Sequence, residues 1–97
     1  MSEVSSLALS DYAAELQCEK NQLCASIKEA SKDRLRELLL EYAQKCEALG
    51  HWYRQEGNKR RAKGDETNAR YCKISAQGEF EQANKARQDA AQTEDVR

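Results

Sequence analysis

The chain of 97 residues contains no proline and only four glycines, at positions 50, 57, 64 and 78. Proline and glycine are the residues that most often mark turns, so their scarcity argues against a fold made of many short elements. The first half of the chain has neither residue type. We therefore expect few, long elements with short connections.

Long hydrophobic runs are also missing, and the longest, such as residues 38–40, span only a few residues. A helix that crosses a bilayer needs about 20 consecutive apolar residues, so the sequence predicts no membrane protein. The start, residues 1–4, lacks the basic segment and apolar core of a secretion signal. We accordingly expect an intracellular, cytoplasmic location.

Residues that carry catalysis or bind metals are few. The cysteines at positions 18, 24, 46 and 72 never form a CxxC pair, and His51 is the only histidine, which leaves a poor zinc ligand set. We expect these cysteines to be small apolar fillers at helix contacts, with a disulfide between helices as the alternative. No nucleophile stands at a useful spacing from His51, and no glycine-rich phosphate loop occurs. The sequence thus predicts no enzyme, no metal and no cofactor.

What the chain does contain is helix-forming and charged. Charged residues make up 34% of it, against about 25% in an average globular protein, and Ala, Glu, Gln, Lys, Arg and Leu dominate. Ser10 and Ser31 are candidate N-caps, while Gly64 and Asp65 together predict a helix end followed by a new cap. We predict helices over about 10–29, 32–62 and 66–91, forming one domain over 10–91 between a flexible N-terminus, 1–9, and a disordered tail, 92–97.

Apolar residues follow a helical period in each segment. The clearest stripe runs through the second segment, and an alanine-rich stripe runs through the third. Gly50 lies inside the second stripe, where a glycine often marks the close approach of a neighbouring helix. The pattern predicts an all-α fold, either an antiparallel helical hairpin or a three-helix bundle. An alternative leaves the first helix detached, or swapped into another subunit.

Residues 56–76 carry a more specific spacing: a small residue at 57, the turn at 64–65, and small residues at 69 and 76. This spacing resembles a tetratricopeptide-type helical hairpin and, more loosely, the hairpin of microtubule-interacting-and-trafficking domains. The resemblance implies that Gly57, Ala69 and Ala76 lie where two antiparallel helices touch. The chain departs from the family at Arg61 and Glu66, where aromatic residues are usual, and it shows no second copy of the repeat.

The densest basic cluster lies near the end of the second predicted helix and comprises Arg54, Lys59, Arg60, Arg61 and Lys63. One interpretation is structural, because positive side chains stabilise the negative end of a helix dipole. The other is a set of phosphate contacts beside aromatic residues that could stack on bases. The net charge of −1, with nine acids against six bases in the first fifty residues, disfavours a dedicated nucleic-acid binder.

The broad apolar stripe and the aromatic residue at its edge favour an interaction module. We predict a non-enzymatic adaptor or assembly subunit that binds another protein, or itself, through apolar helix faces. The residues expected at the interface, or in the core beside it, are Leu38, Leu39, Tyr42, Leu49 and Trp52. The alternative function is a nucleic-acid-associated accessory protein that uses the basic cluster at 54–63.

Overall fold

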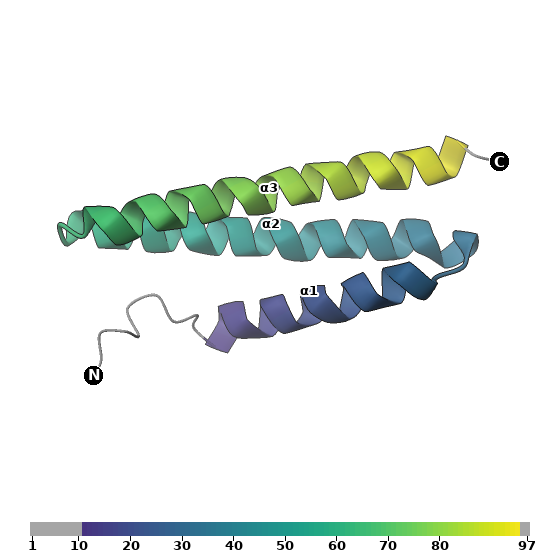
Figure 1. Cartoon of the computed structure of the whole chain (residues 1–97), viewed down its shortest axis with the longest axis horizontal. Helices are drawn as coiled ribbons and strands as arrows, with labels where there is room; N and C mark the ends of the chain where they lie inside the picture. Colours follow the sequence, from purple (N-terminus) through teal and green to yellow (C-terminus); the bar gives the residue numbers. More distant parts are fainter. Residues whose placement is uncertain (1–10, 96–97) are drawn as a thin grey trace.

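The chain folds into three α-helices that lie side by side and alternate in direction (Figure 1). A computed structural model describes residues 11–95, with side chains for 11–93. Helix α1 spans Asp11–Glu29, α2 spans Lys32–Ala62 and α3 spans Glu66–Asp95, and no strand occurs in this described part. The molecule measures 52 × 21 × 14 Å. The predicted all-α fold is confirmed as a three-helix bundle; Ser10, the expected cap of α1, lies outside the described residues.

The turn between α2 and α3 forms as its residue types predict. Gly64 has a φ of +84°, the left-handed conformation that glycine adopts without strain. The amide of Gly64 donates to the carbonyl of Arg61 at 2.9 Å, and that of Asp65 donates to Arg60 at 2.8 Å. These two bonds are a Schellman motif. Asp65 then caps α3, because its Oδ1 accepts the amide of Asn68 at 3.2 Å.

The junction between α1 and α2 is looser. It consists of Ala30 and Ser31, and Ser31 has the extended backbone of an N-cap (φ −71°, ψ 166°). Its side chain makes no capping hydrogen bond, although its carbonyl accepts the amides of Arg34 and Leu35 at 3.1 and 2.9 Å. Ser31 therefore marks the start of α2, as predicted, without the side-chain bond expected of a cap.

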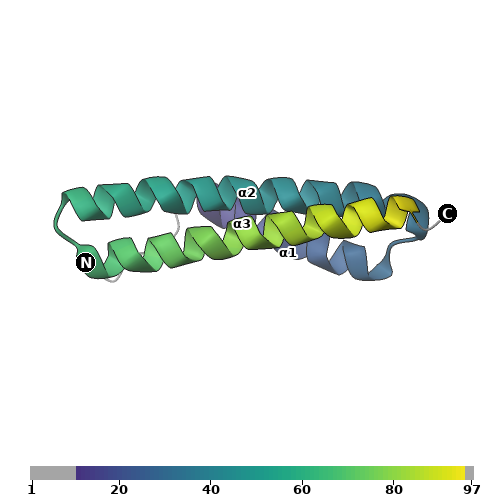
Figure 2. The same ribbon diagram turned by 90° about the horizontal axis from the view of Figure 1, so that it is seen from above.

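Helices α2 and α3 run side by side as an antiparallel pair (Figures 1 and 2). Small residues lie between them. Leu39, Ala43 and Cys46 of α2 form one core cluster with alanines 83, 86 and 90 of α3. A Cβ added to Gly57 would lie 3.1 Å from the Cβ of Cys72, and one added to Gly50 would lie 2.8 Å from the Phe80 ring. The predicted close approach at Gly50 is thus confirmed.

Helix α1 packs on its own hairpin and covers only part of it. With 19 residues against 31 in α2, it lies along the portion away from the α2–α3 turn, as Figure 1 shows. Ala13 and Leu16 form a second core cluster with Leu49, flanked by Ala48 and Trp52. The structure therefore places helix 1 in the same chain's bundle rather than detached.

Two expectations need correction. Helix α3 continues to Asp95, so residues 92–95 are helical instead of belonging to a disordered tail. Ala90 is buried, the hydroxyl of Thr93 donates to its carbonyl at 2.7 Å, and neither glycine nor proline follows Gly78 to stop the helix. Cys46 and Cys72 are buried fillers as expected, but Cys18 and Cys24 are exposed, because only three residues of α1 are buried: Ala13, Leu16 and Lys20.

Candidate interaction surfaces

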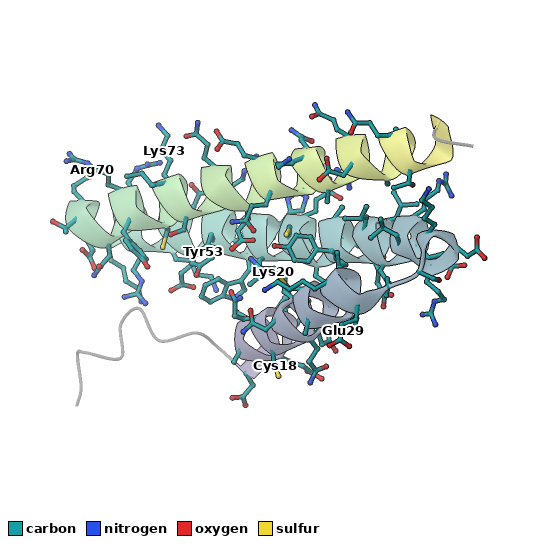
Figure 3. All side chains as sticks on the ribbon, turned by 45° about the vertical axis from the view of Figure 1, so that its right-hand side comes forward. Cys18, Lys20, Glu29, Tyr53, Arg70 and Lys73 are labelled. Atoms are coloured by element: carbon teal, nitrogen blue, oxygen red, sulfur yellow. The ribbon has the colours of Figure 1, made fainter. Side chains whose placement is uncertain are left out.

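A partly buried polar network joins the three helices. Lys20 of α1 donates from Nζ to Oε1 of Glu79 at 2.8 Å and to Oε1 of Gln82 at 3.2 Å, both on α3. The Lys20 and Glu79 side chains are only 8% and 11% exposed. From α2, the hydroxyl of Tyr42 and the thiol of Cys46 donate to the same Gln82 oxygen at 3.2 and 3.7 Å. Figure 3 shows Lys20 directed from α1 toward the hairpin.

Burial raises the pKa of the tyrosine and the thiol that join this network. Burial, followed by the neighbouring Cys46, raises the pKa of Tyr42 to about 12. Burial also raises the pKa of the Cys46 and Cys72 thiols, which keeps them protonated and poorly nucleophilic at neutral pH. Among the described residues no group of three or more His, Cys, Asp or Glu side chains is placed to hold a metal ion, and all four thiols are free.

The residues predicted for an interface divide between core and surface. Leu38, Leu39 and Leu49 are buried within the bundle, so they are occupied by its own packing. Tyr42 is half-buried and belongs to the polar network. Trp52 is half-buried at the edge of the α1–α2 cluster, close to the point where α1 begins. Of the five, Trp52 is the one whose position leaves an apolar side chain partly available.

Trp52 belongs to an aromatic strip, which we define as Trp52, Tyr53, Tyr71 and Ile74. The rings of Trp52 and Tyr53 meet edge to face at 5.2 Å. Burial, and then the Tyr71 phenol on α3, raise the pKa of Tyr53. Tyr71 and Ile74 are three residues apart on α3, hence neighbours on its surface, and are 52% and 64% exposed.

The strip runs from the edge of α1, where Trp52 packs against the α1–α2 cluster, toward the part of the hairpin that α1 leaves uncovered. In Figure 3, Tyr53 lies beyond Lys20 in the direction of the α2–α3 turn. Lys59 follows Trp52 by seven residues on α2 and so shares its side of the helix, and Lys63 comes directly after the end of α2; both are exposed. The result is an apolar surface with a positively charged flank.

The basic cluster does not form a single patch. Arg60 pairs with Glu56 within α2 at 2.9 Å, and the Arg54 guanidinium stacks 5.0 Å from the centre of the Phe80 ring. Arg54 and Arg61 line a groove between α2 and α3, whereas Lys59 and Lys63 lie beside the aromatic strip. Four of the five basic residues are therefore distributed over different faces of α2, and Lys63 lies just beyond its end.

The groove that holds Arg54 and Arg61 is open and has a volume of about 530 Å3. Gly57, Ala69 and Ala76 are buried in its wall, and a Cβ added to Gly57 would lie 3.4 Å from the Ala69 carbonyl. From α3, Lys73 also lines the groove and adds a third positive charge, while Glu81 adds a negative one. Figure 3 shows Lys73 and Arg70 projecting from α3 on the side away from α1. This mixed-charge groove is a second candidate surface.

Sequence reasoning missed Tyr71, Ile74 and Lys20. A signal for the first two existed, because both are large apolar residues that fall off the alanine stripe of the third helix. Their exposure follows from that position. For Lys20 no local signal existed: its partner Glu79 is 59 residues away, and a lysine on a short amphipathic helix normally points to solvent.

Comparisons with known proteins add no relative: no family model matches the chain, and no curated protein or solved structure is significantly similar to it. The resemblance of residues 56–76 to tetratricopeptide-type hairpins accordingly stays a prediction. None of the helices in the described region is long and apolar enough to cross a membrane.

Proposed function

We propose that the chain is a non-enzymatic protein-interaction module that binds an acidic, amphipathic helix of another protein on the aromatic strip. The observation that carries the proposal is the incomplete third layer of the bundle. Among the described residues, helix α1 covers one part of the hairpin, and beyond it Tyr71 and Ile74 are exposed while Trp52 and Tyr53 are half-buried. A partner helix placed there would continue the line of α1 and bury the strip.

The chemistry of the strip supports this kind of partner. Aromatic residues, tryptophan and tyrosine above all, dominate the binding energy of protein interfaces because they bury a large area at little entropic cost. The flanking Lys59 and Lys63 favour acidic residues on the partner. Large apolar side chains at the surface, flanked by charge, are typical of a docking site.

The test compares capture of a partner by the wild-type chain and by a double variant, Tyr71→Ser/Ile74→Ser. Both residues are more than half exposed, so the variant should keep its helix content and melting temperature. We expect it to bind at least about 10-fold more weakly, a loss of over 1 kcal/mol, in calorimetry with the purified partner. A matched control, Lys85→Ser, alters an exposed position on α3 outside the strip and should bind normally.

Two results would count against the proposal. One is undiminished binding by the strip variant. The other is binding that is lost on Arg54→Glu/Arg61→Glu and falls steeply with added salt, because this would assign the interaction to the groove and to a phosphate-rich ligand such as nucleic acid. An interface built on the strip should instead tolerate salt, since its main contribution is apolar burial.

A further inference from the structure

The junction between α1 and α2 carries almost nothing that enforces a turn. It consists of Ala30 and Ser31, and no glycine or proline occurs anywhere between residues 11 and 49. Alanine is the strongest helix former, and serine is tolerated within helices. The Ser31 side chain makes no capping bond. Local chemistry therefore permits a helix to run straight through the junction.

The apolar residues on either side of the junction also keep a common helical register. Leu23 and Ile27 of α1 are followed, at spacings of eight and three residues, by Leu35 and Leu38 of α2. At about 100° per residue, these four side chains would occupy one apolar face of a single straight helix. A turn between α1 and α2 does not require their apolar residues to share one helical register, whereas a continuous helix through the junction does.

The pairing of α1 with α2 is symmetric about the junction. Glu19 and Lys45, whose side chains form an ion pair at 2.9 Å, are each thirteen residues from residue 32. Leu16 and Leu49, which share a core cluster, are sixteen and seventeen residues from it. Two straightened helices that crossed antiparallel at residue 32 would consequently make the same pairs between copies.

From these three observations we propose that two copies of this chain exchange α1. In the exchanged dimer, α1 and α2 of each copy form one helix from Asp11 to Ala62, and each α1 packs on the hairpin of the other copy. Lys20 then reaches Glu79 of the second copy, so every contact of α1 is kept. A two-fold axis at residue 32 brings the half-buried Ile27 and Leu35 of both copies together. Such exchange of an identical element is a low-cost route to a symmetric dimer.

The substitution Lys32→Pro should distinguish the monomer, which has a turn at the junction, from the exchanged dimer, which has a continuous helix there. Proline is favoured at the first position of a helix, and Ser31 already has the extended backbone that a residue before proline requires, so the monomer accepts the change. Inside a continuous helix the same proline removes a hydrogen bond and clashes with the preceding turn, once in each copy. Lys32→Ala is the control, and Ser31→Ala should favour the straight helix.

The experiment is light scattering after each purified chain has been unfolded and refolded over a range of concentrations. Refolding lets two chains exchange α1 as they fold, whereas in the folded monomer α1 would first have to leave its own hairpin. We expect wild type to form a dimer of twice 11.0 kDa with rising concentration, Ser31→Ala to form it more readily, and Lys32→Pro to dimerise at least about 100-fold more weakly. The Tyr71→Ser/Ile74→Ser chain should dimerise like wild type. A wild-type and Ser31→Ala chain that both remain monomeric, or dimers that survive Lys32→Pro, would overturn the proposal.

Discussion

At the scale of single residues, four glycines serve different purposes. Gly64 supplies the left-handed turn, and Gly57 permits α2 and α3 to approach, since a Cβ there would lie 3.1 Å from Cys72 Cβ and 3.4 Å from the Ala69 carbonyl. Neither neighbour can rotate away, because both atoms are fixed by the backbone of α3. Gly78, in contrast, has open space around it.

This difference predicts opposite effects for the same substitution. Gly57→Ala should destabilise the chain by about 1–2 kcal/mol, because overpacking the seam outweighs the gain in helix propensity. Gly78→Ala should stabilise it by about 0.5–1 kcal/mol, because only the propensity gain remains. Urea unfolding followed by circular dichroism measures both. A stabilised Gly57→Ala chain would mean that the helices are less closely packed than described.

Tyr42 predicts a loss of stability at alkaline pH. Its pKa rises from 10.0 to about 12 on folding, so between these values the unfolded chain releases a proton that the folded chain retains. The contribution is fully present below pH 10 and is lost as pH rises toward 12. In melting curves across this range, Tyr42→Phe should show a shallower decline than wild type. Melting temperatures that decline equally in both chains would contradict this, and would show that Tyr42 is more solvated than described. Some decline is expected in either chain, because the pKa values of Tyr53, Cys46 and Cys72 are also raised.

At the scale of elements, α1 is the weakly attached helix. It contributes two core residues to the α2 contact, and its remaining buried side chain is the charged Lys20. The ion pair between Lys20 and Glu79 compensates both charges inside the bundle. Removing one member of a buried pair leaves the other without compensation.

A double-mutant cycle on Lys20 and Glu79 measures how much their pairing contributes to the free energy of unfolding. Lys20→Met alone should lower the free energy of unfolding by roughly 3 kcal/mol, because Glu79 is then buried without a cation. Lys20→Met/Glu79→Leu should recover most of that loss, because two apolar side chains of similar size pack without desolvation. Denaturant titrations of the four chains give the coupling. Additive losses would indicate that the pair is solvated and that α1 is held by Leu16 and Ala13 alone.

How much of each element the sequence predicted depends on whether its signal was local. The α2 boundaries and the α2–α3 turn followed from residues within a few positions of one another, such as Gly64 and Asp65. The end of α3 did not, because burial of Ala90 against α2 extends a helix that carries no stop signal. Exposure of Cys24 was likewise unpredicted, since a helical stripe does not show how much of its width a short helix will bury.

The candidate surfaces depended still more on tertiary arrangement. Periodicity marked Trp52 as an edge residue, which the structure confirms, but it could not show that Leu38, Leu39 and Leu49 would be used within the bundle. Adjacency in the sequence suggested one basic patch, whereas the helical turn directs Arg60 toward Glu56 and Arg61 into the groove. The strip itself exists because α1 is shorter than the hairpin, a property of the assembled fold.

At the scale of the whole molecule, charge and apolar surface gather at the end that bears the α2–α3 turn. Residues 54–73 contain seven basic and three acidic side chains in a chain whose net charge is −1. The aromatic strip lies toward this same end. The opposite end is bound into the three-helix core, so the proposed binding of an acidic partner is assigned to the half of the molecule that α1 does not cover.

The most direct test of this account is to map amide chemical shifts of the isotope-labelled wild-type chain while the purified partner is added. We expect the largest changes at Tyr71 and Ile74, with blue-shifted emission from Trp52, the single tryptophan of the chain; Tyr53 also lines the groove and does not distinguish the two surfaces. Changes confined to Arg54, Arg61 and Lys73, with the strip unaffected, would contradict it and assign the function to the groove.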